Sequence, residues 1–259
     1  MSDFNKDNAY QAKGDDVFVR NSLLFTPLSI AYPPPFPCLF PRLLLSANLS
    51  SQPHQFDDGR EIALLHYIYS RPNLDAEIRN KPTAVLAAID SYARTDKYLM
   101  NVGDLKGKIV TDLIAKHKPS TMIELGGYIG YSTILFADAV RSAGGKAYFS
   151  FERNPEFAAV ISSLVDLAGL GGFVKVIVGA SDAGIKRAHD GGNGPLKHVD
   201  FMFLDHYKPA YTTDLKLCEE LGLVGVGSVY AADNCITPGN PPYVEYVNCL
   251  LYTSPSPRD

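Results

Sequence analysis

The strongest constraint on the fold is a regular alternation of short apolar runs with segments of helical spacing between residues 121 and 232. Each apolar run has the length of a strand, and the segments between the runs have the three- and four-residue apolar spacing of helices. Strands joined by helical crossovers run parallel to one another. We therefore predict an α/β fold with a doubly wound, mostly parallel sheet. The expected strands are 121–125, 147–151, 174–178, 201–204 and 227–232.

Helices are expected both before and within this alternating region. Three amphipathic segments precede the first strand, and Pro82 marks the start of the second of them. We expect these three to cover one side of the sheet and one mouth of a site. The predicted helices are 61–69, 81–93, 106–116, 131–141, 155–168, 182–189 and 211–221.

Polar side chains follow two of the expected strands at the point where each strand ends. Asp205 comes directly after strand 201–204, and Lys208 follows three residues later. Asp233 and Asn234 follow strand 227–232 in the same way. Ligands bind outside the carboxyl ends of strands in open α/β sheets, and carboxylate and amide oxygens suit Mg²⁺. The pattern predicts a metal-assisted group transfer with Lys208 as a base, although Asp205 as a helix cap is the simpler alternative.

A glycine-rich turn, Glu124-Leu-Gly-Gly-Tyr-Ile-Gly-Tyr-Ser132, joins the first expected strand to its helix. Glycines let the backbone approach a ligand closely, and such turns bind NAD, FAD or S-adenosylmethionine. Glu152 follows the second strand at a spacing suited to ribose hydroxyls. No arginine clamp or second glycine motif for a pyrophosphate is evident, which favours the methyl donor over a dinucleotide.

Composition excludes several classes of partner. The net charge of −4 and the lack of a Lys/Arg run argue against nucleic acid. The cysteines form no CxxC pair, which favours a reducing, cytoplasmic setting, and the polar N-terminus has no secretory signal. The apolar stretch 22–45 contains six prolines, so a membrane-spanning helix is not expected there.

Changes in composition and apolar pattern along the sequence predict three regions. Residues 1–55 are interpreted as an N-terminal extension, either disordered or translated from a retained intron. Residues 56–248 are predicted to be the functional domain, and residues 249–259 are a tail that does not look native.

Several motifs in order resemble the catechol O-methyltransferase family, in its fungal-like form, over roughly residues 58–247. The resemblance implies a Rossmann-like class I methyltransferase fold, S-adenosylmethionine as methyl donor and Mg²⁺ as cofactor. The motifs are Met100-Asn-Val-Gly-Asp104 with Lys106-Gly-Lys108, Glu124 to Ser132, Val178-Gly-Ala-Ser181, Phe203-Leu-Asp-His-Tyr-Lys208 and Ala232-Asp-Asn-Cys-Ile-Thr-Pro238-Gly.

The same resemblance implies roles for individual residues. Asp205, Asp233 and Asn234 would hold the metal, and Lys208 would be the general base. The donor site would be lined by Val102, Glu124, Gly126, Tyr128, Ser132, Glu152, Ser181 and His206, with packing an equal alternative for His206. The catechol slot would be formed by Tyr98, Met100, Tyr207, Lys208, Asn234 and Pro238.

The predicted function is therefore Mg²⁺-dependent transfer of a methyl group from S-adenosylmethionine to one hydroxyl of a small-molecule catechol, by a monomeric enzyme. The alternatives are a cation-dependent O-methyltransferase of phenylpropanoid-type vicinal diols, a nicotinamide oxidoreductase, or an inactive truncated fragment. The chain departs from the family in three ways. Tyr98 and Tyr207 stand at positions where the family often has tryptophan. The family's final strands and a late acidic residue have no counterpart in this sequence.

Overall fold

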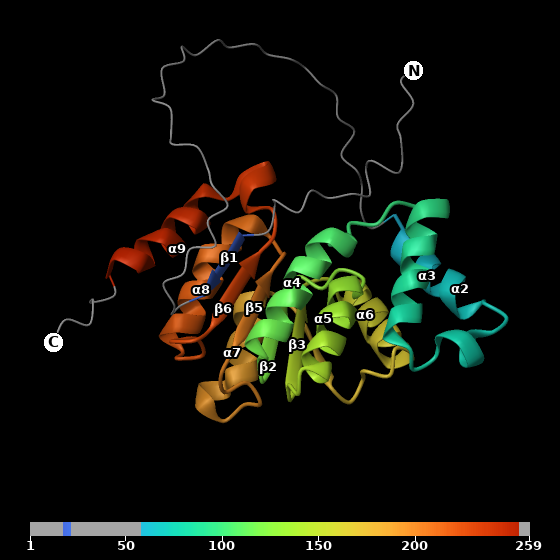
Figure 1. Cartoon of the computed structure of the whole chain (residues 1–259), viewed down its shortest axis with the longest axis horizontal. Coiled ribbons are helices and arrows are strands. Elements are labelled where there is room, and N and C mark those ends of the chain that lie inside the picture. Colours follow the sequence, from blue (N-terminus) through green and yellow to red (C-terminus); the bar gives the residue numbers. More distant parts are fainter. Residues whose placement is uncertain (1–17, 22–57, 254–259) are drawn as a thin grey trace, which may run out of the picture.

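The computed structural model of the protein describes residues 18–21 and 58–253. It is built around one six-stranded sheet with helices on both faces (Figure 1). Five strands run parallel, as predicted: β2 (Thr121–Leu125), β3 (Ala147–Glu152), β4 (Val174–Val178), β5 (Phe201–Leu204) and β6 (Val229–Ala232). The spatial order is β1-β6-β5-β2-β3-β4, so the chain starts in the middle of the parallel sheet and winds outward in both directions.

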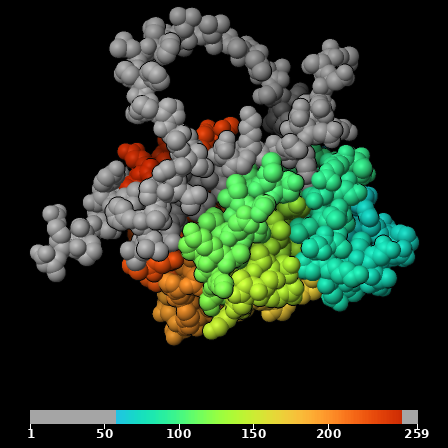
Figure 2. Space-filling view, in the orientation of Figure 1, coloured from blue at the N-terminus to red at the C-terminus, as the bar shows by residue number. Residues whose placement is uncertain are grey.

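The helices divide between the two faces. The first face is covered by α2 (Arg60–Tyr69), α3 (Pro82–Thr95), α4 (Gly103–His117), α5 (Tyr131–Ser142) and α6 (Pro155–Leu167). The second is covered by α7 (Ser181–His189), α8 (Tyr211–Glu220) and α9 (Pro241–Thr253). In the space-filling view, the surfaces of α2 and α3 adjoin those of the helices that follow (Figure 2). Short single turns lie at η2 (Leu74–Ile78), η3 (Asp190–Gly192), η4 (Lys208–Ala210) and η5 (Cys235–Gly239).

Each strand sends alternate side chains into two separate cores, because successive strand residues point to opposite faces. In β5, Phe201 and Phe203 pack under the first group of helices, whereas Met202 and Leu204 pack under the second. All four are fully buried, as expected of a strand covered on both faces. This double burial explains why the strands appear in the sequence as continuous apolar runs.

Two elements were not predicted. Strand β1 (Phe18–Asn21) pairs antiparallel with β6, with Phe18 opposite Ala232, and so covers the outer edge of β6. Helix α9 continues past residue 248 into the range expected to be a tail. The other residues of the expected N-terminal extension lie outside the described part of the chain.

The glycine turn between β2 and α5 fixes the distance between two strand ends. Gly126 has a φ of +93°, and a Cβ atom placed on it would lie 2.6 Å from the backbone oxygen of Asp205. Its amide donates to Phe151 O at 2.9 Å, and the amide of Asp205 donates to Leu125 O at 2.9 Å. Only glycine fits here, since both the backbone conformation and the approach of the β5 end exclude a side chain.

We predict that Gly126→Ala lowers the free energy of unfolding by about 2–5 kcal/mol, because it adds a clash with rigid backbone to the strain of a positive φ. Urea denaturation followed by circular dichroism measures this loss. Gly144→Ala is the matched control, since Gly144 also has a positive φ but has no atom within 4 Å of a built Cβ. Its expected loss is only about 1–2 kcal/mol. Equal losses in the two variants would show that the close approach to Asp205 has no energetic weight.

Candidate functional site

The two predicted metal-binding carboxylates lie at neighbouring strand ends. Leu204 and Ala232 are opposite one another in the parallel β5–β6 pair, so Asp205 and Asp233 follow at the same level. The amide of Asp233 also donates to Leu204 O at 2.9 Å. Parallel pairing therefore brings together two residues that are far apart in sequence, as predicted.

Two lysines neutralise this acidic pair. Lys208, on η4, donates from Nζ to Asp205 Oδ1 at 3.3 Å and to the hydroxyl of Tyr211 at 3.0 Å. Lys106, on α4, donates to both oxygens of Asp233, at 2.7 Å and 3.0 Å. Lys106 was not among the predicted site residues, although it lies inside one of the quoted motifs. A lysine on a helix gives no sequence signal that it will be buried against an acid on a distant strand.

The proximity of the carboxylates is visible in their electrostatics. Burial and the nearby negative charge of Asp233 raise the pKa of Asp205 to about 7, against the opposing effect of Lys208 and Lys106. A buried acid beside a second acid resists ionisation, and such a pair favours added positive charge.

Asn234 directly follows the second carboxylate in a left-handed backbone conformation, with φ of +57°. Its backbone N–H donates to Asp233 Oδ1 at 2.6 Å, and its side-chain Nδ2 lies 3.4 Å from Thr237 O. Among residues 58–253, no three His, Cys, Asp or Glu side chains cluster as a metal site. The predicted set instead comprises two carboxylates and one amide, a combination of hard oxygen donors that fits Mg²⁺.

The predicted donor residues gather around the glycine turn. The carboxylate of Glu152 accepts from the backbone amides of Tyr128 at 2.9 Å and Asn154 at 2.8 Å, which fixes it at the end of β3. The hydroxyl of Tyr128 donates to buried Glu61 at 2.7 Å. Val102 and Ser132 are buried near the starts of α4 and α5.

Glu124 lies beneath the turn and is completely buried. It accepts hydrogen bonds from Thr133 at 2.5 Å and Ser150 at 2.9 Å. Burial raises its pKa to about 7, although hydrogen bonds from Ser132, Thr133 and Ser150 oppose the rise. In this structure, Glu124 braces the strand below the glycine turn, and its contact with a donor stays a prediction.

Ser181 and His206 share one acid that the sequence did not single out. The hydroxyl of Ser181 donates to Asp214 Oδ2 at 2.5 Å, and Nε2 of His206 lies 2.9 Å from the same oxygen. The His206 ring also stacks on Tyr211 at 4.8 Å between ring centroids. Asp214, buried on α8, thereby fixes two predicted donor residues from different elements.

Four of the six residues predicted to form the catechol slot are exposed, whereas Lys208 and Asn234 are half-buried. Tyr98, Met100 and Pro238 are all accessible, and Tyr207 is 71% exposed. Arg60 donates to the backbone oxygen of Tyr98 at 2.8 Å, which ties the loop before α4 to α2.

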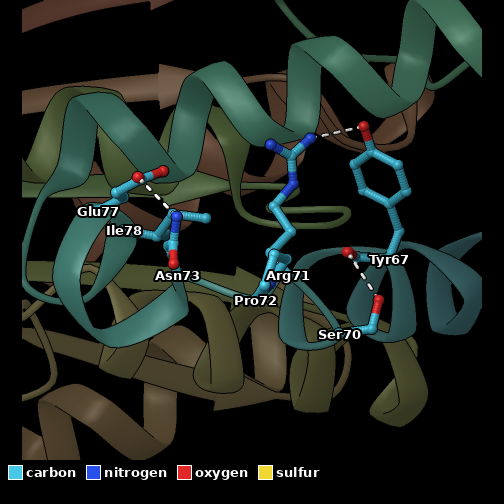
Figure 3. Close-up of a pocket in the computed structure, with 7 residues that line it drawn as sticks. All are labelled: Tyr67, Ser70, Arg71, Pro72, Asn73, Glu77 and Ile78. Carbon is cyan, nitrogen blue, oxygen red and sulfur yellow. Dashed lines mark hydrogen bonds between the residues drawn. The ribbon is translucent and has the colours of Figure 1, made fainter.

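A hollow of about 440 Å³ lies elsewhere, on the surface formed by α2 and η2 (Figure 3). Its polar groups bind one another: Arg71 donates to the Tyr67 hydroxyl at 2.6 Å, and Asn73 donates to Glu77 at 2.9 Å. It contains none of the predicted site residues.

None of the helices in the described ranges is long and apolar enough to cross a bilayer.

Comparison with known proteins gives a consistent pattern. Residues 123–235 match the family model described as a methyltransferase domain. The chain is 39% identical over 182 residues to catechol O-methyltransferase of Mus musculus, an alignment that covers 67% of this chain and 66% of the mouse protein. It is 38% identical over 151 residues to the Sus scrofa protein of the same name, covering 57% of this chain and 77% of that relative.

The chain thus spans just under two thirds of the mouse relative, and it spans 62% of the Bos taurus catechol O-methyltransferase. Two solved structures share its fold at a TM-score of 0.52. The O-methyltransferase TomG from Streptomyces achromogenes, in complex with SAM, is 21% identical and covers 67% of this chain and 78% of its own. The SAH-bound Podospora anserina methyltransferase PaMTH1 is 19% identical and covers 76% and 86%. Together with the parallel sheet, these neighbours confirm the predicted class I methyltransferase fold.

Glu124 provides a pH-dependent stability test. Its folded-state pKa is raised from 4.5 to about 7, so the folded protein binds the proton of Glu124 more tightly than the unfolded chain does. Protonation of Glu124 therefore stabilises the folded state. Its contribution is fully present below about pH 4.5 and is lost as the pH rises through 7, a loss of up to about 3 kcal/mol. We predict that Glu124→Gln makes the fall in stability smaller by this amount, while the fall due to Asp205, whose pKa is also raised to about 7, stays.

Urea denaturation at pH 5 and pH 8 measures the effect, and exposed Glu156→Gln on α6 is the control that should retain the wild-type fall. An identical pH dependence in wild type and Glu124→Gln would contradict the prediction.

Proposed function

Because the chain belongs to the catechol O-methyltransferase family, we propose that it transfers a methyl group from S-adenosylmethionine to one hydroxyl of a catechol with the aid of Mg²⁺. The observation that carries the proposal is the pair of carboxylates at the β5 and β6 ends, with Lys208 3.3 Å from one of them. We assign the function to residues 56–248, acting as a monomer in the cytoplasm.

Asp205, Asp233 and Asn234 would hold the ion, since they supply oxygen donors from one rim of the sheet. When bound, Mg²⁺ would lower the pKa of a catechol hydroxyl and fix the orientation of its two oxygens. The fully buried strands beneath the rim provide a rigid base for the donors. This rigidity supports chemistry that depends on alignment of the two substrates.

Lys208 would take the phenolic proton. The Asp205 carboxylate and the Tyr211 hydroxyl hold its Nζ at the rim, where the side chain is 26% exposed and open to a substrate. A neutral amine in this position would accept the proton as the oxygen attacks the methyl group.

The donor would lie along the glycine turn. Each oxygen of Glu152 accepts a backbone amide, so the carboxylate is fixed and retains lone pairs for ribose hydroxyls. Val102, Gly126, Tyr128, Ser132, Ser181 and His206 would line the rest of the donor site. Glu124, which lies at the β2 end of the glycine turn, would complete the donor site.

The substrate would rest between exposed apolar side chains from three loops. A second candidate substrate class is the phenylpropanoid-type vicinal diols, which is favoured by the wide exposure of Tyr207 and by the tyrosine at position 98. The remaining slot residues would be Met100, Asn234 and Pro238.

Transfer of a labelled methyl group from S-adenosylmethionine tests the function directly. A panel of simple catechols and phenylpropanoid diols, each assayed with Mg²⁺ and with a chelator, separates the two substrate classes. Label transfer that requires both a vicinal diol and Mg²⁺ supports the proposal. A folded protein that transfers no label under any condition would contradict the proposed activity.

We predict that Lys208→Met lowers kcat by about 10²–10⁴-fold, the usual contribution of a general base. Binding of S-adenosylmethionine, measured by calorimetry, should be unchanged. Lys186→Met on α7 is the control, since Lys186 is exposed and lies outside the proposed site. Full activity in Lys208→Met would rule out its role as the base.

We also predict that Asp205→Ala abolishes Mg²⁺-dependent turnover, because the substitution removes one proposed ligand. Initial rates across a range of Mg²⁺ concentrations measure the loss. Wild-type rates in the presence of a chelator would be incompatible with the mechanism.

A further inference from the structure

Lys106 is the more deeply buried of the two lysines that face the acidic pair. Its residue is 4% exposed, and that of Asp233 is 3% exposed. Lysine is almost never buried to this degree without a charged partner. The ammonium of Lys106 contacts both oxygens of the Asp233 carboxylate, at 2.7 Å and 3.0 Å.

The two lysines differ in how firmly they are held. Lys208 contacts one oxygen of Asp205 at 3.3 Å and the Tyr211 hydroxyl at 3.0 Å, and its side chain is 26% exposed at the rim. Lys106 is bound at 2.7 Å on a helix that packs against α5, so its position is fixed by the fold. Only the first of these cations can readily move aside for a substrate.

The charges of the cluster balance without any added ion. At pH 8, above the pKa of Asp205, Asp205 and Asp233 contribute two negative charges, and Lys106 and Lys208 contribute two positive ones. A divalent ion bound to Asp233 would share that carboxylate with a fixed ammonium a short distance away. Like charges at this range repel strongly in a buried setting.

From this arrangement we propose that Lys106 is a positioning residue: a built-in counter-ion that holds Asp233 ready in the metal-free protein and weakens the binding of Mg²⁺. The proposal rests on the proposed function only in its choice of ion. A cation supplied by the chain keeps the strand ends in place between turnovers, and the repulsion keeps the bound ion exchangeable.

Lys106→Met tests the proposal, because methionine keeps an unbranched, apolar side chain and removes the charge. Titration calorimetry at pH 8 should show Mg²⁺ binding at least about tenfold tighter in the variant than in wild type. The metal-free variant should melt at a lower temperature than metal-free wild type, and saturating Mg²⁺ should restore most of the difference. The matched control is Lys108→Met on the same helix, where the lysine is exposed and pairs with Asp112.

Unchanged or weaker Mg²⁺ binding in folded Lys106→Met would overturn the proposal. If the metal-free variant does not fold, its circular dichroism is followed during refolding against Mg²⁺ concentration. Recovery at millimolar Mg²⁺ supports a counter-ion role, whereas no recovery overturns it. A wild-type protein that binds Mg²⁺ but transfers no methyl group would refute the proposed function while leaving the test of Lys106 intact.

Discussion

Two carboxylates held side by side at the ends of β5 and β6 are the constraint around which the site is arranged. Hydrogen bonding between parallel strands fixes the backbones from which the two side chains extend, so the chain relieves their repulsion with nearby cations and not by moving the strands apart. Lys106 and Lys208 reach the pair from opposite sides of the sequence, one from before the first parallel strand and the other from just after β5. The same unfavourable proximity that requires these lysines makes the rim suitable for a metal ion.

Much of the fold could be predicted because its strands are covered on both faces. Double burial makes each strand an uninterrupted apolar run, and the parallel arrangement follows from the helical segments between the runs. The placement of Asp205 beside Asp233 follows from the same logic. Strand β1 could not be predicted, because four residues paired with a strand near the far end of the chain leave no local pattern.

The parts of the site that the sequence missed share a physical reason. Lys106 and Asp214 act through partners on other elements, and their neighbours in sequence resemble any amphipathic helix. Glu124 shows the reverse case, since its position at a glycine turn suggested a ligand contact. Its actual partners, Thr133 and Ser150, come from the next helix and the next strand, which only the folded chain brings together.

The pairing of β1 with β6 has a consequence for the order of folding. The outermost strand at this edge is the first described segment to be synthesised, whereas the strand that it joins is the last of the sheet. Loop closure over nearly the whole chain is entropically slow compared with the local β–α–β contacts. The parallel core should therefore fold first, and residues 18–21 should pair with β6, the strand that precedes Asp233, late in folding.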